Sequence, residues 1–215
     1  NFTIYDTDDS QRLMKSCIAD ADVSEKQFPP RAVLTEISLA KDRMCSPEYF
    51  CIEAGSDYRK MVIGKLYKEY QNRLKSANAL DFDDLIYKTV ELLESFPEEL
   101  EYYQNRFRYI MVDEYQDTNH AQFRLVQLLS QKHQNLCVVG DDDQSIYAFR
   151  GARSDFLLHF PTLYPAAKKV TLNTNLIYSD YFSDQTGNQV YIKPENMQFT
   201  GAYKVRGSYY KISTL

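Results

Sequence analysis

The 215-residue chain is long enough for one large domain or two small ones, and its 44% hydrophobic and 14% aromatic content fits a folded protein rather than a disordered one. No apolar run approaches the roughly 20 residues of a membrane-spanning helix, and no signal peptide is visible, so we expect a cytoplasmic protein with no membrane partner. The net charge of -5 argues mildly against nucleic-acid binding but leaves room for a local basic groove.

The four cysteines are scattered along the chain without a CxxC pair. A zinc site needs closer pairing or histidines placed near the cysteines. We therefore expect free thiols in a reducing compartment.

Residues 1–105 predict a mostly helical segment. The stretch TDDSQRLMKSCIADA opens with four candidate N-capping residues, 7–10, and QFPPRAVLTEISLAKDRM opens with two prolines, which are tolerated at a helix start. SPEYFCIEAG continues the helical pattern, and YRKMVIGKLYKEYQNRLKSAN predicts a long amphipathic helix. DFDDLIYKTVELLESFPEELEYYQNRF predicts two helices separated at a proline. The residues expected on the apolar face of the long helix are Met61, Val62, Leu66 and Tyr70.

The pattern changes near Phe107. RYIMVDE and NLCVVGD are short continuous apolar runs that end in acid, which is typical of buried parallel strands with functional residues at their carboxyl ends. NHAQFRLVQLLSQKH predicts a crossover helix between them, and KKVTLNTN predicts a third strand. This order indicates a βαβ unit of an α/β domain. Residues 176–215 predict short strands and turns.

The first acidic strand end, IMVDEYQDTN, brings Asp113, Glu114 and Asp117 close together in sequence. Like charges repel, and a divalent metal ion is the usual compensating partner. In nucleoside-triphosphate hydrolases one acid at this place holds Mg²⁺, and its neighbour orients or deprotonates the attacking water. The alternative is that Asp113 merely caps the following helix while the other acids are solvated.

The second strand end continues as VVGDDDQSIYAFRGA, residues 138–152. Gly140 permits a tight turn, Gln144 can reach a γ-phosphate or the catalytic water, and Arg150 can meet a phosphate. Tyr147 and Phe149 offer flat faces on which bases stack. The alternative is a solvated acidic turn followed by two ordinary core aromatics.

The GDD triplet also permits a metal-dependent polymerase or nuclease, in which two acids of a hairpin hold two metal ions. Such a hairpin should continue into a second strand. QSIYAFRGARSDFLLHF instead predicts a loop followed by a helix.

The two strand ends together resemble the UvrD/Rep/PcrA type of superfamily 1 DNA helicase. VDEYQDT resembles that family's motif II, VVGDDDQSIYAFRGA resembles its motif III, and ALDFDDLI, residues 79–86, resembles a further signature. The helical stretch upstream is similar to the family's inserted helical subdomain. The resemblance covers residues 1–175.

The resemblance implies an α/β fold in three parts. Residues 1–105 would form a helical, 1B-like subdomain, and residues 106–175 part of a RecA-like, 1A-like motor domain, a parallel-sheet P-loop NTPase fold. Residues 176–215 would form an unassigned β-rich tail. The implied activity is ATP-driven 3′ to 5′ movement on single-stranded DNA with unwinding at duplex junctions, with ATP and Mg²⁺ as cofactors and repair or replication proteins as further partners.

The resemblance also assigns roles to residues. Asp113 would be the Mg²⁺ ligand and Glu114 the catalytic base. Gln116 would couple the nucleotide to the DNA site, Gln144 would sense the γ-phosphate during catalysis, and Arg150 would link the nucleotide and DNA sites.

Bases of the DNA would contact or stack on Tyr147 and on Phe149, which stands where the family commonly has tryptophan.

Two departures from the family pattern limit these expectations. No G-x-x-x-x-G-K-[ST] phosphate loop occurs in the chain, and we expect it in a preceding segment. After Asn175 no resemblance is visible, and Ile177 stands where a phosphate-contacting arginine is expected. We therefore expect the chain alone to hydrolyse ATP poorly. The alternative is a truncated, catalytically silent paralogue that binds DNA or a protein.

Overall fold

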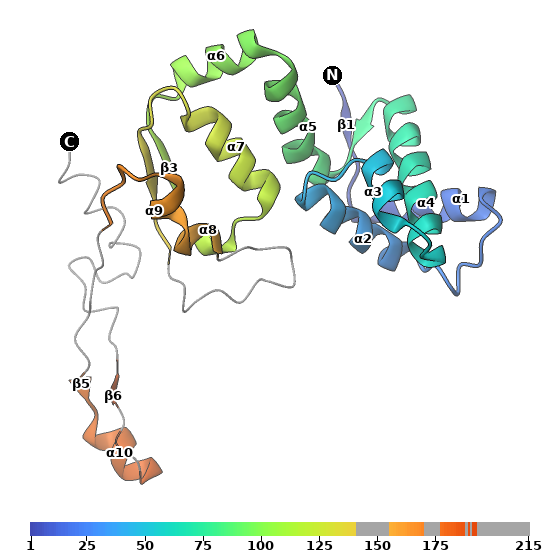
Figure 1. The fold of residues 1–215 in the computed structure, drawn as a ribbon. Helices are drawn as coiled ribbons and strands as arrows, with labels where there is room; N and C mark the ends of the chain where they lie inside the picture. The colour runs from blue at the N-terminus through green and yellow to red at the C-terminus, as the bar shows by residue number, and fades with distance from the viewer. Residues whose placement is uncertain (141–154, 170–176, 188, 190, 193–215) are drawn as a thin grey trace.

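The computed structural model describes residues 1–140, 155–169, 177–187, 189 and 191–192. These residues are mostly helical and contain two small parallel sheets, in agreement with the predicted α/β class (Figure 1). Within these ranges, no helix is both long enough and apolar enough to span a bilayer.

The N-terminal part contains the predicted helices and one strand pair that the sequence did not reveal. The helices are α1 (Thr7–Asp20), α2 (Pro30–Asp42), α3 (Pro47–Ala54) and α4 (Tyr58–Ser76). Strands β1 (Thr3–Ile4) and β2 (Ala79–Leu80) pair in parallel. The predicted caps of α1 were wrong: Asp6, just before them, accepts a hydrogen bond from the Asp9 amide at 2.9 Å.

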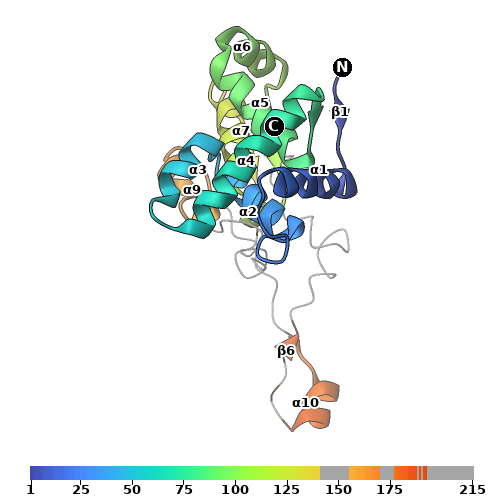
Figure 2. The same cartoon turned by 90° about the vertical axis from the view of Figure 1, so that its right-hand side faces the viewer.

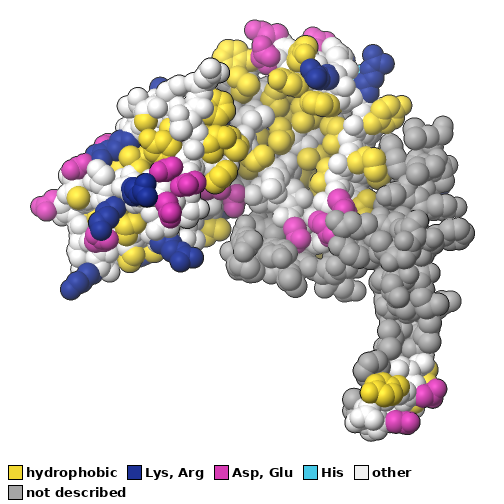
Figure 3. Space-filling model, turned by 180° about the vertical axis from the view of Figure 1, so that it is seen from behind, with side chains coloured by type: hydrophobic (Ala, Val, Ile, Leu, Met, Phe, Trp, Pro, Cys, Tyr) yellow, Lys and Arg dark blue, Asp and Glu magenta, His cyan; other side chains and the backbone are white. Residues whose placement is uncertain are grey.

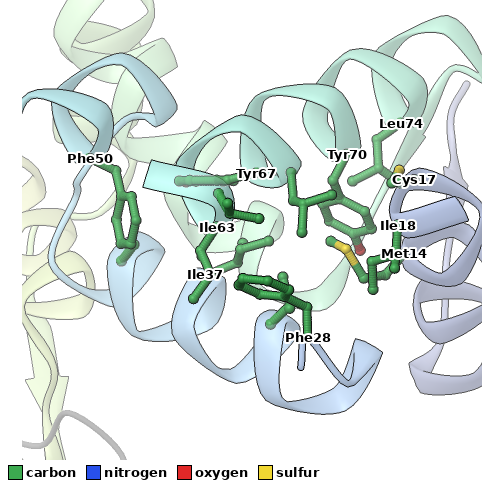
Figure 4. Packing of buried hydrophobic residues seen from close by; sticks show 14 of the residues in the cluster. Met14, Cys17, Ile18, Phe28, Ile37, Phe50, Ile63, Tyr67, Tyr70 and Leu74 are labelled. Atoms are coloured by element: carbon green, nitrogen blue, oxygen red, sulfur yellow. The ribbon is translucent and has the colours of Figure 1, made fainter. Parts of the chain in front are cut away.

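A single apolar core joins these four helices (Figure 4). Its labelled members point toward one another from α1, α2, α3, α4 and the loop that contains Phe28. The buried face of α4 includes the predicted Val62, Leu66 and Tyr70, whereas Met61 is 41% exposed. Met61 lies about 100° around the helix from Val62, which turns it toward solvent.

Helices α5 (Phe82–Ser95), α6 (Pro97–Arg106) and α7 (His120–Ser130) enclose a second apolar cluster, around Val90, Leu93 and Leu128. Figure 2 shows α5, α6 and α7 side by side above α2. This cluster joins helices on both sides of residue 105, the subdomain boundary predicted from the sequence. That boundary stays a prediction.

The predicted βαβ unit is confirmed. Strands β3 (Ile110–Val112) and β4 (Leu136–Val138) pair in parallel, with Met111 opposite Cys137, and α7 connects them. A short 3₁₀ turn, η1 (Tyr115–Asp117), follows β3. Helices α8 (Asp155–Leu158) and α9 (Phe160–Leu163) pack beside η1, and Phe156 of α8 stacks on Phe123 of α7 with ring centroids 4.2 Å apart.

Most of the C-terminal part for which strands and turns were predicted lies outside the described residues. Strands β5 (Ile177–Tyr178) and β6 (Tyr191–Ile192) form an antiparallel pair, but helix α10 (Asp180–Thr186) lies between them. The sequence did not predict this helix. Most of the predicted third strand, residues 168–175, lies outside the described residues, and Lys168 and Lys169 are not in a strand.

Large apolar side chains remain exposed before and within β3. Tyr102, Phe107, Tyr109 and Met111 are between 44% and 59% exposed. Figure 3 shows hydrophobic side chains gathered on one face of the molecule, beside the grey residues. About half of each of these side chains is therefore in contact with solvent, which is more than a buried apolar residue usually leaves exposed.

A buried ion-pair network anchors the last turn of α2 to the start of α5. The ammonium of Lys41, 1% exposed, lies 2.6 Å from Asp81 Oδ2 and 2.9 Å from Asp84 Oδ1. The Tyr70 hydroxyl donates to Asp81 Oδ2 at 3.0 Å, and Asp81 and Asp84 also form the capping box of α5. Each charge therefore has a partner of opposite sign, which buried charges require.

We predict that Lys41→Met lowers the free energy of unfolding by about 3–5 kcal/mol, because it leaves two buried carboxylates without their cation. Urea denaturation followed by circular dichroism measures this change. Lys88→Met is the matched control, since Lys88 pairs with Glu91 at the surface, where the two side chains are 44% and 42% exposed. That control should cost less than about 1 kcal/mol. Equal losses in the two variants would contradict the structural role of Lys41.

Candidate functional site

The chain turns sharply where β3 ends, and this turn presents the two adjacent acids. Glu114 adopts a left-handed backbone conformation, with φ 51°, which is uncommon for a residue other than glycine. Its amide donates to Asp113 Oδ1 at 3.0 Å, so the Asp113 side chain stabilises the turn. The Asp113 side chain is exposed, whereas Glu114 is half-buried.

The side chain of Gln116 orients the carboxylate of Glu114 through a hydrogen bond. The Gln116 side chain is 1% exposed, and its Nε2 donates to Glu114 Oε2 at 2.9 Å. The Glu114 carbonyl accepts a hydrogen bond from the Asp117 amide, also at 2.9 Å. Side chain and backbone of Glu114 are thus both fixed by η1, which restricts the directions in which its carboxylate can point.

The end of β4 lies directly against this turn. The Val139 amide donates to the Val112 carbonyl at 2.8 Å, and the Tyr115 amide donates to the Val139 carbonyl at 2.9 Å, which extends the ladder beyond the two strands. At Gly140 a Cβ atom would lie 2.7 Å from Gln116 Oε1 and 3.3 Å from the Gln116 amide nitrogen. Only glycine lets the chain after β4 come this close to Gln116.

A hollow of about 400 Å³ opens beside the turn. Its lining includes Asp113, Glu114 and Asp117 together with Gln122 of α7. Asp117 Oδ1 is buried and has no hydrogen-bond partner among the described residues. Burial, and then the nearby Glu114 charge, raises the pKa of the Asp117 carboxyl. The hollow is therefore acidic, and a cation would relieve its repulsion.

The alternative role of Asp113 as a helix cap is excluded. Asn119 caps α7: its Oδ1 accepts from the Gln122 amide at 2.9 Å, and Gln122 Oε1 accepts from the Asn119 amide at 3.1 Å. The N-x-x-Q spacing of this capping box was visible in the sequence and would have identified the cap.

The donors present fit a magnesium ion held mainly by a nucleotide. Among the described residues, no three His, Cys, Asp or Glu side chains come together as a metal site, so the turn offers no ligand set made of protein side chains alone. Mg²⁺ in nucleotide sites takes one or two carboxylates and completes its shell with phosphate oxygens and water. The exposed Asp113 carboxylate suits that single protein ligand.

Four predicted site residues lie outside the described residues. They are Gln144, Tyr147, Phe149 and Arg150. Their roles stay predictions, although the chain enters this segment through Gly140, in contact with Gln116.

Comparison with known proteins decides the family. The profile of the UvrD/REP helicase N-terminal domain matches residues 1–165. The chain belongs to the UvrD/REP helicase family. This membership leaves no support for a polymerase or nuclease hairpin at the GDD triplet.

Curated relatives in the UvrD/REP family are named ATP-dependent DNA helicase PcrA. The chain is 48% identical over 175 residues to the protein of Staphylococcus epidermidis, a match that covers 81% of the chain and 24% of the relative. It is 41% identical over 215 residues to the protein of Bacillus subtilis, covering 98% of the chain and 29% of the relative. The chain thus spans about a quarter of the length of these relatives.

The Bacillus subtilis match corrects one expectation. A match over 98% of the chain extends past Asn175, where the sequence alone showed no resemblance to the family. The Staphylococcus epidermidis match covers only 81%. The family profile ends at residue 165, and the Bacillus subtilis match extends the similarity beyond it.

We predict that Gly140→Ala lowers the free energy of unfolding by about 1–3 kcal/mol, because the new methyl group overlaps the buried Gln116 side chain. Gln116 cannot move aside without losing its hydrogen bond to Glu114. Urea denaturation measures the loss.

The control for Gly140→Ala is the same substitution in a Gln116→Ala background. Removing the Gln116 amide removes the closest clash, so Gly140→Ala should cost at least about 0.5 kcal/mol less there. Equal costs in the two backgrounds would show that the strand ends do not meet at Gln116.

Proposed function

We propose that the chain is part of an ATP-dependent DNA helicase that couples hydrolysis of Mg²⁺-bound ATP to 3′ to 5′ movement on single-stranded DNA. The observation that carries this proposal is the pair of adjacent acids at the carboxyl end of β3, in a chain of the UvrD/REP helicase family. The names of its relatives, ATP-dependent DNA helicase PcrA, support ATP as the energy source and DNA as the substrate.

In this proposal Asp113 holds the Mg²⁺ ion and Glu114 takes the proton of the attacking water. The ion, when bound with ATP, neutralises the charge that develops on the phosphates. The Asp113 side chain is exposed at the hollow, where an incoming ion can reach it, while Glu114 is oriented by Gln116. A base needs such an orientation because proton transfer demands a fixed distance to the water.

Gln116 is well situated to couple the nucleotide to DNA. Its side chain contacts Glu114 on one side and the backbone at Gly140 on the other. Gly140 leads into the segment that contains Gln144, Tyr147, Phe149 and Arg150, for which the family resemblance implies nucleotide and DNA contacts. A movement of that segment would displace Gln116 and reorient Glu114.

We further propose that β3 and β4 belong to a larger RecA-like sheet in a longer protein located in the cytoplasm. The exposure of Met111, in the middle of β3, supports this, because further strands and helices of such a domain would cover it. Residues 1–105 would be the inserted helical subdomain, and residues 176–215 stay unassigned. Duplex junctions and repair or replication proteins are the expected further partners.

The test compares the isolated chain with a chimera in which it replaces the matching part of the Bacillus subtilis relative. We expect the chain alone to show no DNA-stimulated release of phosphate, because it has no phosphate loop. The chimera should hydrolyse ATP, and Glu114→Gln in the chimera should lower its kcat by about 10²–10⁴-fold with little change in the KM for ATP.

Glu101→Gln is the matched control, because Glu101 is a surface acid that pairs with Lys132. It should leave kcat unchanged. If the Glu114→Gln chimera has the same kcat as the unmodified chimera, the proposed role of Glu114 is wrong. A folded chimera that binds single-stranded DNA without hydrolysing ATP would favour the silent binding module instead.

A further inference from the structure

The last turn of α2 contacts both α5, which comes before α6 and β3 in the chain, and α7, which follows β3. Lys41 is bound by Asp81 and Asp84 at the start of α5. Asp42, the next residue, contacts Asn119 at the start of α7. Met44, just after α2, packs against the apolar cluster that α5 and α7 share. This part of α2 is therefore a joint between the N-terminal helices and the βαβ unit.

The contact between Asp42 and Asn119 is short and specific. Asn119 Nδ2 donates to Asp42 Oδ1 at 2.6 Å across 77 residues of sequence. Asn119 Oδ1 accepts at the same time from the Gln122 amide, so both ends of the Asn119 side chain are engaged. A rotation of Asn119 would break the cap of α7 and the contact with α2 together.

The hydrogen bond between Asn119 and Asp42 lies at the C-terminal end of the acidic turn. Asn119 follows residues 113–118 directly, and within that segment the Tyr115 amide donates to the Val139 carbonyl beyond β4. The turn is thus fixed between two supports, the end of β4 and the last turn of α2. Loss of the second support would leave Asp117 and Thr118 free to shift relative to β3.

We propose that Asp42 is a positioning residue that sets, through Asn119, the placement of the acidic turn at residues 113–118 relative to the N-terminal helices. The consequence for catalysis rests on the proposed function of Asp113 and Glu114. The physical coupling does not, because it is a property of the fold.

The surroundings of Asp42 favour its role as a hydrogen-bond acceptor and disfavour its negative charge. Burial, and then the charge of Asp83 on α5, raises the pKa of the Asp42 carboxyl to about 6. The charge is therefore unfavourable at this place, while the acceptor oxygen is used. An asparagine would keep an acceptor for Asn119 and remove the repulsion by Asp83.

The test is amide hydrogen exchange of the whole chain, measured by NMR without nucleotide or DNA. Asp42→Ala should raise the exchange rates of the Tyr115, Asp117, Thr118 and Gln122 amides by about tenfold or more, while amides in α4 keep theirs. The side-chain amide signals of Gln116 should shift in the same variant. Asp42→Asn should restore both readouts to the values of the unmodified chain.

Two further variants sharpen the result. Glu94→Ala is the matched control: Glu94 also joins α5 to α7, through Arg124 at 2.6 Å, but it does not contact Asn119, so its loss should leave the turn unchanged. Asn119→Ser keeps a good capping residue but removes the Nδ2 donor, and it should loosen residues 115–118 as Asp42→Ala does. Asn119→Ser also tests the hydrogen bond by itself if Asp42→Ala does not fold.

Three outcomes would overturn the proposal. Exchange at the turn could stay unchanged in both Asp42→Ala and Asn119→Ser. It could rise equally in α4, which would indicate general destabilisation. Asp42→Asn could behave like Asp42→Ala, which would show that the acceptor is not what matters. Since none of these readouts uses ATP, they stay separate from any failure of the helicase assignment.

Discussion

The parallel pairing of β3 with β4 is the constraint on which the site depends. Parallel strands end at the same edge of a sheet, so the residues that follow them must meet there. The ladder continues past the strands through Val112, Val139 and Tyr115, and this brings Gly140 against Gln116. The left-handed Glu114 is tolerated because hydrogen bonds on both sides hold it. Without this register, Asp113 and Glu114 would be two acids on an ordinary loop.

The joint at the end of α2, made by Lys41 and Asp42, fixes how the N-terminal helices are placed against the βαβ unit. Buried ion pairs seldom raise stability over a well-packed apolar core, but they strongly disfavour arrangements that leave one charge unpaired. Lys41 has its partners only when α2 meets the start of α5, and Asp42 meets Asn119 only when α7 is docked beside them. The joint thus selects one arrangement of the N-terminal helices around the βαβ unit, which an apolar contact alone would specify less sharply.

The sequence predicted what local patterns determine. Helical periodicity located α1, α2, α4, α5, α6 and α7, and two apolar runs ending in acid located β3 and β4. Asp113 and Glu114 were recognised because the VDEYQDT motif that contains them has the residue types and order of a known family motif. Met61 was wrongly predicted to lie on the buried face because consecutive helical residues point about 100° apart, so Met61 and Val62 cannot both face the core fully.

Contacts between distant residues could not be predicted from one sequence. Lys41 looked like any surface lysine, and nothing local indicated that Asp42 would meet Asn119 or that β1 would pair with β2. Two-residue strands carry no periodicity. That Gly140 faces Gln116 depends on the register of β3 and β4, which the pattern of the strands alone does not define.

The most direct test of this account is a set of nuclear Overhauser effects between the two strand ends, measured on the labelled chain. The account predicts parallel cross-strand contacts that pair Ile110 with Leu136 and Val112 with Val138, together with contacts from the Gly140 α-protons to the Gln116 side chain. Antiparallel or absent cross-strand contacts, or a Gln116 side chain remote from Gly140, would contradict it.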